Sequence, residues 1–250
     1  MAQERILLVD VGNTNTHFAV ATAERILDKH PRELPTAKLE TISAVIDRRY
    51  SRLVACSVVP EKIPVLRRVA RKLTGREPLL LSPKLDLGIG IRYPNPKQIG
   101  ADRLANAIAV AHLYGAPAVV VDFGTAVTFD IVNSRREYVG GVIATGLNAM
   151  TNYLHEKTAQ LPRITIREPR SAIGKSTVEA MRVGAVIGYR GLIRGVLSSL
   201  KAELRAKKLR VIATGGYAEL IAAKMPEIEC VDPLLTLQGL RILFGRNKSD

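Results

Sequence analysis

The feature that most constrains this chain is a hairpin pattern that occurs twice. An apolar run leads into Asp-x-Gly and a turn rich in hydroxyl or amide side chains, first in LLVDVGNTNTHFAV and again in VVVDFGTAVTFDIV. Each copy predicts a buried strand, a tight turn at Gly12 or Gly124, and a second strand that returns antiparallel. Because Asp10 and Asp122 occupy the same place in the two copies, we expect an α/β protein with two related halves, 1–117 and 118–250.

Hairpins of this kind can hold phosphate groups. Glycine allows close approach, backbone N–H groups and Thr or Asn side chains donate to phosphate oxygens, and a carboxylate at the strand end can hold a hydrated cation. The same residue types also make ordinary turns, so a single copy leaves both interpretations open. Two copies that face one another favour a clamp for the metal-bound triphosphate of a nucleotide.

The composition agrees with an α/β core and with a cytoplasmic protein. Aromatic residues make up only 4% of the 250 residues and Trp is absent, so Val, Ile, Leu and Ala must build the core. The N-terminus leads directly into a predicted strand and lacks the pattern of a signal peptide. The longest apolar stretch, about 105–121, is interrupted by His112, Gly115 and Pro117, so no membrane span is expected.

Several common chemistries are excluded. Cys56 and Cys230 are too few and too isolated for a disulfide framework, and we expect both to be buried, reduced thiols. The four histidines share no metal-ligand spacing, so zinc chemistry is unsupported. The run GKST resembles the end of a P-loop, but Pro169 stands where that motif needs glycine and no strand directly precedes it.

The chain is strongly basic, with a net charge of +14. Such charge favours anionic partners, although basic residues on helices usually form solvated outer faces. The solvated-face interpretation is favoured here, and nucleic-acid contact remains the alternative. The basic residues concerned are Arg67, Arg68, Arg71, Lys72 and Arg76, followed by Lys201, Arg205, Lys207, Lys208 and Arg210.

The remaining elements are expected to alternate between strands and helices. In the first half we expect a strand near 38–42, a helix from about 43, a strand over 52–60, a basic helix over 61–72 and a strand over 77–82. A helix over 104–113 should link the halves. In the second half we expect strands through 132 and near 138–143, helices over 147–160 and 176–207, a strand over 209–216, a further helix, and a final helix over 236–244.

Two further motifs could carry chemistry. ATGGYAEL places paired glycines after a strand, where a purine or ribose could lie against bare backbone. GADR follows the rigid turn YPNP and ends in Asp102 and Arg103 at the start of a predicted helix. Asp102 could simply cap that helix, which would stabilise it by roughly 1 kcal/mol. Without other information the cap is the simpler interpretation.

Six runs in order, DVGNTNTHF, YPNPKQIGADRLANA, VVDFGTAVTFD, GGVIATGLNAM, IGKSTVEAMRVG and ATGGYAE, resemble type III pantothenate kinases over nearly the whole chain. The resemblance implies the acetate and sugar kinase, Hsc70 and actin superfamily, in which two ribonuclease-H-like halves close over ATP in a cleft. It implies ATP-dependent phosphorylation of pantothenate to 4′-phosphopantothenate, the first step of coenzyme A biosynthesis. It also implies Mg²⁺, a monovalent cation (K⁺ or NH₄⁺) and a homodimer.

The same resemblance assigns roles to individual residues. Asp102 matches the proposed catalytic base, Asp122 the monovalent-cation ligand, and Asp10 a residue that helps to place Mg²⁺, directly or through water. The residues that match the ATP site are Asp10, Val11, Gly12, Asn13, Thr14, Asn15, Thr16, His17 and Thr125. Those that match the pantothenate site are Tyr93, Gly100, Ala101, Asp102, Arg103 and Thr177.

The chain departs from the family pattern at three positions. Val127 stands where threonine is common, Thr145 replaces a proline, and Arg194 occupies a position that is often acidic. Loss of a hydroxyl at 127 could weaken nucleotide contacts. Two rival functions stay open: a non-catalytic nucleic-acid-binding or transcription-accessory protein on the same fold, and a kinase for another small alcohol.

Overall fold

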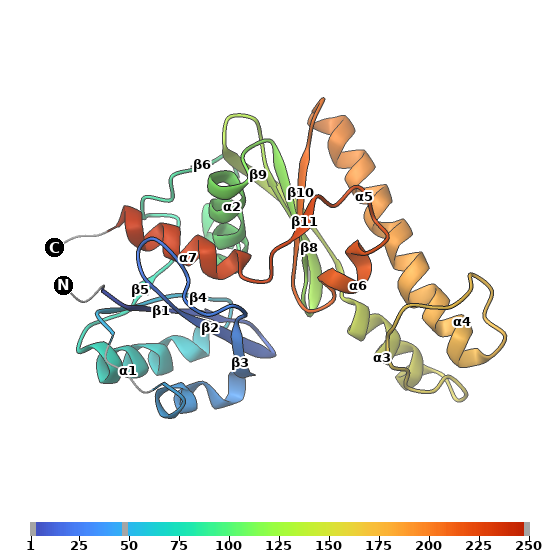
Figure 1. The fold of residues 1–250 in the computed structure, drawn as a ribbon, viewed down its shortest axis with the longest axis horizontal. Coiled ribbons are helices and arrows are strands. Elements are labelled where there is room, and N and C mark those ends of the chain that lie inside the picture. The colour runs from blue at the N-terminus through green and yellow to red at the C-terminus, as the bar shows by residue number, and fades with distance from the viewer. Residues whose placement is uncertain (1–3, 47–49, 248–250) are drawn as a thin grey trace.

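The computed structural model describes residues 4–46 and 50–247, which form two mixed β-sheets with helices between and around them (Figure 1). In the first sheet, the central strand β1 (Ile6–Val11) pairs antiparallel with β2 (Asn15–Ala21) and parallel with β4 (Arg52–Ser57). The short strands β3 (Arg32–Pro35) and β5 (Leu79–Leu80) lie at its two edges, giving the order β3-β2-β1-β4-β5.

The second sheet repeats this arrangement. Beyond the edge strand β6 (Gly90–Ile91), its order β9-β8-β7-β10-β11 places an antiparallel meander beside two parallel strands, as in the first sheet. The repeat confirms the α/β class and the duplicated hairpin. The strands are β7 (Ala118–Phe123), β8 (Ala126–Val132), β9 (Glu137–Thr145), β10 (Arg210–Thr214) and β11 (Cys230–Val231).

Two helices pack against each other between the sheets. They are α2 (Ala101–Leu113) and α7 (Leu235–Arg246), and α7 also packs against β1 and β4 although it belongs to the second half of the sequence. One apolar cluster joins the inner faces of both sheets through α2, with Leu8 from one sheet and Val120 from the other. The inner core therefore fixes the ends of β1 and β7 relative to each other.

Other helices cover the outer faces. α1 (Ile63–Thr74) packs on the first sheet beside the 3₁₀ segment η1 (Thr36–Ala44). On the second sheet, α3 (Leu147–Lys157) and a long helix extend away from the first sheet (Figure 1). The long helix consists of α4 (Thr177–Val183), the π-helical η4 (Gly184–Gly188) and α5 (Tyr189–Glu203). The shorter segments are η2 (Pro60–Lys62), η3 (Pro96–Gln98) and α6 (Ala218–Ala222).

Four sequence-based expectations need correction. The third strand lies at 32–35, and the stretch predicted as a strand at 38–42 is 3₁₀-helical. The helix expected from about 43 is not found up to residue 46, and residues 47–49 lie outside the described part. Helix α2 begins at Ala101 rather than 104, and the long helix ends at Glu203, shortly before Arg205 with a positive φ of 49°.

A short strand was missed altogether. β6 (Gly90–Ile91) pairs parallel with β9, so a segment from the first half of the sequence extends the second sheet. Both cysteines are free thiols, and Cys56 is buried while Cys230 is partly exposed. Across residues 4–46 and 50–247, no helix has the length and apolar character that a membrane span requires.

The contact between α2 and α7 predicts a sharp difference between two glycines of the same helix. A Cβ at Gly239 would lie 2.0 Å from the carbonyl oxygen of Ala105, whereas a Cβ at Gly245 would meet no atom within 4 Å. We therefore expect Gly239→Ala to lower the free energy of unfolding by about 1–3 kcal/mol through overpacking. Gly245→Ala should be neutral or stabilising. Chemical denaturation measures both, and equal effects would contradict the packing account.

Candidate active site

The two repeated hairpins meet at their tips. Thr14 lies in the turn of the first hairpin and Thr125 in the turn of the second, and their Oγ1 atoms are 3.2 Å apart. Both side chains are exposed, so they remain accessible to a ligand. Two loops that are 111 residues apart in sequence therefore bring two hydroxyl groups together on one surface. This arrangement suits an anion with several oxygens.

Asp10 lies at the end of β1, where its side chain is 14% exposed. Residue Cys56 is its register partner on β4, and the Cys56 thiol donates a hydrogen bond of 3.1 Å to Asp10 Oδ1. The other oxygen, Oδ2, lies 3.9 Å from His17 Nδ1. One carboxylate oxygen is thus held by a hydrogen bond, and the other faces His17 on β2.

Asp122 occupies the matching place in β7. The Asn106 side-chain amide donates to Asp122 Oδ2 at 3.2 Å. Gly215, at the end of β10, has a φ of 91°, and a Cβ there would lie 2.7 Å from Asp122 Oδ1. The paired-glycine motif therefore borders this carboxylate, and Gly215 is required both for its backbone conformation and for the close approach.

Asp102 lies in the first turn of α2. Gly100 is the N-cap residue of this helix, so the interpretation of Asp102 as the cap is wrong. Asp102 Oδ1 accepts a hydrogen bond of 2.8 Å from the backbone N–H of Arg103. A carboxylate so close to a helix N-terminus is stabilised by the helix dipole, which helps to hold it charged in a partly buried place.

The three carboxylates form one electrostatic cluster. Burial, together with repulsion from Asp102 and Asp122, raises the pKa of Asp10 to about 7 against the opposing effect of the Cys56 hydrogen bond. Burial, followed by repulsion from Asp102, raises the pKa of Asp122 to about 6. The pKa of Asp102 is also raised by burial, against the favourable effect of its hydrogen bond and the positive charge of Arg103. Closely spaced negative charge of this kind attracts cations.

A fourth carboxylate, Asp130 on β8, was not identified from the sequence. It is fully buried, and it accepts a 2.6 Å hydrogen bond from Arg103 Nε. Burial raises the pKa of Asp130 to about 7 even though Arg103 opposes the shift. Asn106 lies 3.4 Å from Asp130 Oδ2, and its Oδ1 accepts from Thr236 of α7 at 2.8 Å. The sequence does carry one feature that could identify Asp130, because it is a charged residue within a largely apolar strand.

Most other predicted phosphate-loop residues lie at the first turn, but two are buried. Val11 and Thr16 are fully buried, and Thr16 Oγ1 lies 3.0 Å from Thr36 Oγ1. Their side chains are therefore not accessible to a ligand. Only glycine fits at position 12 without a shift of the turn, because a Cβ there would lie 2.9 Å from the carbonyl oxygen of Asn15. Asn13 is exposed at the tip.

Tyr93 and the GADR segment are brought together, whereas Thr177 is not. The Tyr93 ring packs edge-to-face on Tyr138, with centroids 6.1 Å apart, and Arg103 lies over the same Tyr138 ring at 6.0 Å. Thr177 begins α4, which lies far from α2 (Figure 1). Just before it, Ser176 Oγ accepts from Glu179 N at 3.3 Å, so the GKST run is a helix cap and not a phosphate loop.

The three departures from the family pattern lie outside the carboxylate cluster. Val127 is fully buried in the outer core of the second sheet, so its side chain points away from the hairpin tips. The Thr145 carbonyl accepts from Tyr189 Oη at 2.9 Å. Arg194 donates to Glu227 at 2.8 Å on the exposed side of α5. None of the three alters a residue that faces the carboxylates.

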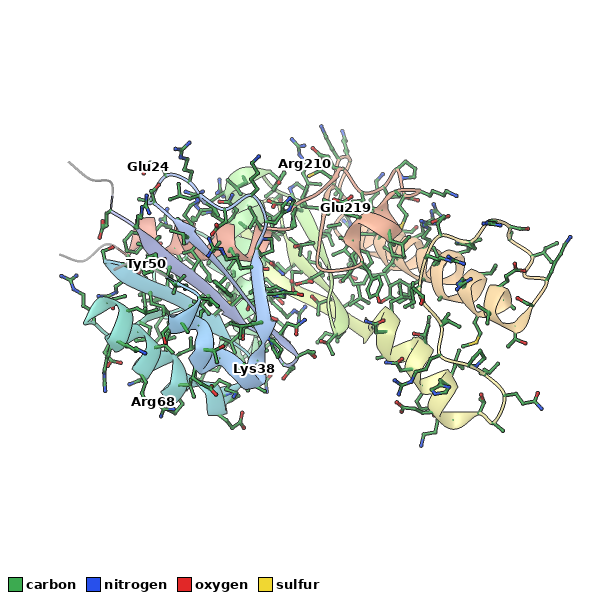
Figure 2. The ribbon with its side chains drawn as sticks, turned by 60° about the horizontal axis from the view of Figure 1, so that its bottom comes forward. Glu24, Lys38, Tyr50, Arg68, Arg210 and Glu219 are labelled. Atoms are coloured by element: carbon green, nitrogen blue, oxygen red, sulfur yellow. The ribbon has the colours of Figure 1, made fainter. Side chains whose placement is uncertain are left out.

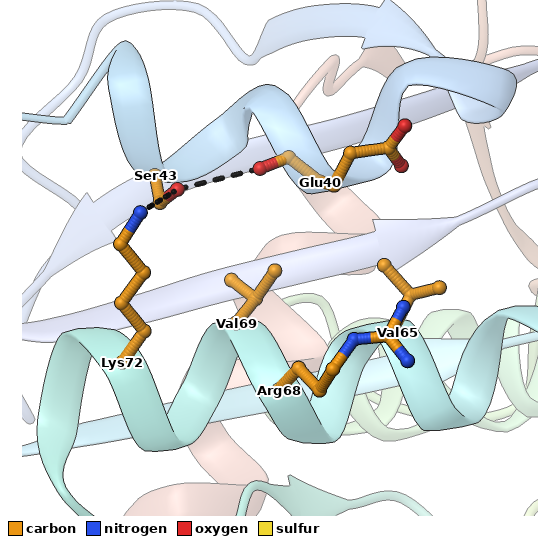
Figure 3. A pocket seen from close by; sticks show the side chains of 6 residues that line it. All are labelled: Glu40, Ser43, Val65, Arg68, Val69 and Lys72. Atoms are coloured by element: carbon orange, nitrogen blue, oxygen red, sulfur yellow. Dashed lines mark hydrogen bonds between the residues drawn. The ribbon is translucent and has the colours of Figure 1, made fainter.

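The basic surface is spread over the molecule. Lys38 and Arg68 lie on the first half and Arg210 on the second (Figure 2), and Arg210 forms an ion pair with Glu229. A shallow pocket lies between η1 and α1 on the outer face of the first sheet, where Lys72 Nζ donates to Ser43 Oγ at 3.3 Å (Figure 3). Its lining residues are Glu40, Ser43, Val65, Arg68, Val69 and Lys72. This pocket contains none of the predicted site residues.

The donors present suit Mg²⁺ bound together with phosphates. In the part of the chain that the structure describes, no three His, Cys, Asp or Glu side chains form a metal cage. Mg²⁺ is commonly held by one or two carboxylates, water and substrate phosphates, which matches Asp10 beside the hairpin tips. Carboxylate oxygen also suits a monovalent cation at Asp122.

The raised pKa of Asp122 predicts a pH-dependent stability in the absence of ligands. Its pKa of about 6 in the fold exceeds the ordinary value of 3.8, so the folded state loses stability as the pH rises through about 6. Asp122→Asn removes the buried charge and should raise the free energy of unfolding by roughly 1–2 kcal/mol at pH 7.5. The gain should shrink towards pH 4.5, because the parent carboxyl is then protonated.

Thermal unfolding without nucleotide, Mg²⁺ or K⁺ measures this difference. Asp86→Asn is the matched control, because the pKa of exposed Asp86 is lowered, first by the Gly88 N–H and then by Arg246. That variant should have no stabilising effect at pH 7.5. An Asp122→Asn variant with a lower melting temperature than the parent at pH 7.5 would refute the electrostatic account.

Comparison with known proteins agrees with this geometry. The family model for type III pantothenate kinase matches residues 6–199. A type III pantothenate kinase from Akkermansia muciniphila is 48% identical over 248 residues, covering 96% of this chain and 98% of that protein. A type III pantothenate kinase from Methylacidiphilum infernorum is 43% identical over 258 residues, covering 98% of this chain and 91% of that protein.

Solved structures show the same fold at low sequence identity. A conserved putative Baf family transcriptional activator from Campylobacter jejuni has a TM-score of 0.60 and 20% identity, covering 96% of this chain and 98% of that one. The activator of 2-hydroxyisocaproyl-CoA dehydratase from Clostridium difficile, solved with bound ADPNP, has a TM-score of 0.53 and 13% identity. The match covers 98% of this chain and 95% of that one. These neighbours show that the two-sheet fold of this chain occurs in other proteins.

Proposed function

The chain belongs to the type III pantothenate kinase family and phosphorylates pantothenate with ATP in coenzyme A biosynthesis, and we propose that Asp102 is the base in this reaction. The observation that carries the proposal is the convergence of the two acidic hairpins on the N-terminus of α2. A base must lie within hydrogen-bond reach of the hydroxyl proton, on the open side of the phosphate-binding surface. Asp102 lies close enough to Asp10 and Asp122 for its charge to raise the pKa of both, which supports a place for it beside the phosphate-binding surface.

In the proposed mechanism, Asp102 accepts the proton of the substrate's primary hydroxyl while that oxygen attacks the γ-phosphorus in line. Such transfers have loose transition states, so positioning and charge neutralisation supply most of the rate. The backbone N–H of Arg103 and the helix dipole hold the Asp102 carboxylate in one orientation. Its raised pKa makes it a better proton acceptor than an exposed aspartate.

ATP is proposed to lie with its phosphates along the two hairpin tips. Thr14 and Thr125 would donate to phosphate oxygens from opposite sides, and the bare turn at Gly12 would admit the chain of phosphates. Mg²⁺ bound at Asp10 would neutralise the negative charge that develops on the phosphate oxygens. Asp122 would hold the monovalent cation, whose charge would offset the repulsion among the carboxylates.

Pantothenate is proposed to lie beside Tyr93 and the GADR segment, which share the Tyr138 ring. Thr177 is far from this place in a single chain, so its assigned role would need a second copy or a movement of α4. A homodimer is supported by exposed apolar side chains on the second half. They are Ile143, Tyr153, Leu154, Ile173, Ile187 and Leu192.

The remaining assignments are also proposals. We propose that the halves 1–117 and 118–250 act as the two walls of the ATP site, with β6 and α7 crossing between them. A cytoplasmic location fits the role in coenzyme A biosynthesis. A nucleic-acid role is disfavoured, because several basic side chains are paired with glutamates, as Arg71 is with Glu77 and Arg194 with Glu227.

Replacement of the base tests the mechanism. Asp102→Asn keeps the shape of the side chain but cannot accept the proton, so kcat should fall by roughly 10²–10⁴ while the fold remains intact. The measurement is pantothenate-dependent ADP formation in a coupled assay with Mg²⁺ and K⁺, alongside binding of an ATP analogue. Asp86→Asn, which removes the exposed ion pair with Arg246 at the C-terminal end of α7, is the control and should keep parental turnover. An Asp102→Asn enzyme with parental kcat would remove Asp102 from this role.

A further inference from the structure

The guanidinium of Arg103 is held in a cradle built by two adjacent strands. Nε donates to Asp130 Oδ1 at 2.6 Å, and Nη2 donates to the Phe129 carbonyl at 3.0 Å. The third side is the Tyr138 ring, whose centroid lies 6.0 Å from the Arg103 Cζ. Such a cation over an aromatic face adds a modest attraction. Arg103 is therefore fixed at three points, although its side chain is still 15% exposed.

A glycine keeps the cradle open. Gly141 is the register partner of Asp130 in the pairing of β8 with β9. A Cβ at this position would lie 1.9 Å from Arg103 Nη2 and 2.0 Å from the Phe129 carbonyl oxygen. No side chain larger than hydrogen fits there while Arg103 keeps its place. The strand pairing, the buried carboxylate and the glycine thus specify the same position for the guanidinium.

We propose that Asp130 is a positioning residue for the pantothenate step, because it fixes Arg103 so that the remaining nitrogen, Nη1, faces the bound substrate. Within the described residues, Nε and Nη2 have hydrogen-bond partners, whereas Nη1 has none. Every buried side-chain nitrogen or oxygen of those residues has a partner, so Nη1 is not buried. Nη1 is therefore the accessible corner of an otherwise enclosed group. This inference rests on the proposed roles of Arg103 in pantothenate binding and of Asp102 as the base.

The same contact also affects the base. Arg103 follows Asp102 directly, and its backbone N–H donates to Asp102 Oδ1 at 2.8 Å. Because the Arg103 side chain is anchored to β8, the first turn of α2 cannot rotate without breaking the Asp130 contact. Asp130 thus orients both a substrate contact and the carboxylate that accepts the proton, although it touches neither the substrate nor the phosphates.

The surroundings show why a carboxylate is present at this buried position. Asp130 is 0% exposed, and a buried charge is costly unless it is paired and hydrogen-bonded. Arg103 supplies the pairing on Oδ1, and the Asn106 amide lies 3.4 Å from Oδ2. Asn106 is held in turn by Thr236 of α7 at 2.8 Å. The orientation of Asp130 therefore depends on contacts from both α2 and α7.

The first test is Asp130→Asn, which keeps the side-chain shape and removes the charge that fixes Arg103. Steady-state kinetics are measured with pantothenate varied at saturating Mg·ATP, and with ATP varied at saturating pantothenate. We expect kcat/KM for pantothenate to fall by about 10²-fold, since a small misplacement of a positioning group has effects of this size. The KM for ATP should change by less than about twofold, because the hairpin tips are untouched.

A double-variant cycle separates positioning from general damage. If Asp130 acts through Arg103, then Asp130→Asn should cause no further loss in an Arg103→Ala background. A loss in the double variant equal to the product of the two single-variant losses would overturn the proposal, because the two residues would then act independently. Equal losses in kcat/KM for pantothenate and for ATP would also overturn it, since they would indicate a general structural role.

Arg103→Lys covers the case in which Asp130→Asn does not fold. Lysine keeps the positive charge but cannot contact Asp130 and the Phe129 carbonyl together. We expect a similar fall in kcat/KM for pantothenate with an unchanged melting temperature, and parental activity would overturn the proposal. Asp86→Asn breaks an exposed Asp–Arg pair and is the matched control. Absence of pantothenate-dependent turnover in the parent would instead indicate failure of the proposed function itself.

Discussion

The burial of neighbouring carboxylates is the constraint on which the rest of this structure depends. Asp10 and Asp122 end the central strands of two different sheets, and Asp102 begins the helix between them. Burial raises the pKa of all three, and repulsion from Asp102 adds to the raised pKa values of Asp10 and Asp122, so the ligand-free arrangement is costly near neutral pH. Cations relieve this cost when they bind, and a nucleotide that arrives with its metal ion brings them. The charge pattern thus couples stability to the substrates of the reaction.

The topology brings these groups together at the ends of regular elements. Each sheet places an Asp-x-Gly hairpin at the end of its central strand, and the contact between α2 and α7 sets the separation of the two sheets. The absence of a side chain at Gly239 allows that contact to be close. Asn106 and Thr236 then connect the two helices to the carboxylates through buried hydrogen bonds. The core and the site therefore share the same residues.

The parts that could be predicted from sequence are those with local causes. The Asp10 and Asp122 hairpins follow from an apolar run, a glycine and a polar turn, all within a few residues. The edge strand β3 was misplaced because RELP has no apolar alternation, and its pairing with β2 decides its position. The start of α2 was placed three residues late, because its N-cap residue Gly100 has no capping side chain that would mark the helix start.

The residues that were missed depend on contacts between distant segments. Asp130, Asn106 and Cys56 look like ordinary strand or helix residues until β8, α2 and β4 are packed together. Asp130 alone had a local signal, as a charge within an apolar strand. The resemblance to a family supplied the roles of Asp102 and Thr177, and the structure separates these two residues within one chain (Figure 1).

The central claim is that two acidic hairpins hold the phosphates of one nucleotide. A crystal structure of the protein with Mg²⁺, K⁺ and a non-hydrolysable ATP analogue tests it most directly. The account predicts electron density for the triphosphate between Thr14 and Thr125, with the metal ion beside Asp10 and the γ-phosphate turned towards Asp102. A triphosphate bound elsewhere, or one that contacts only one of the two hairpins, would contradict it.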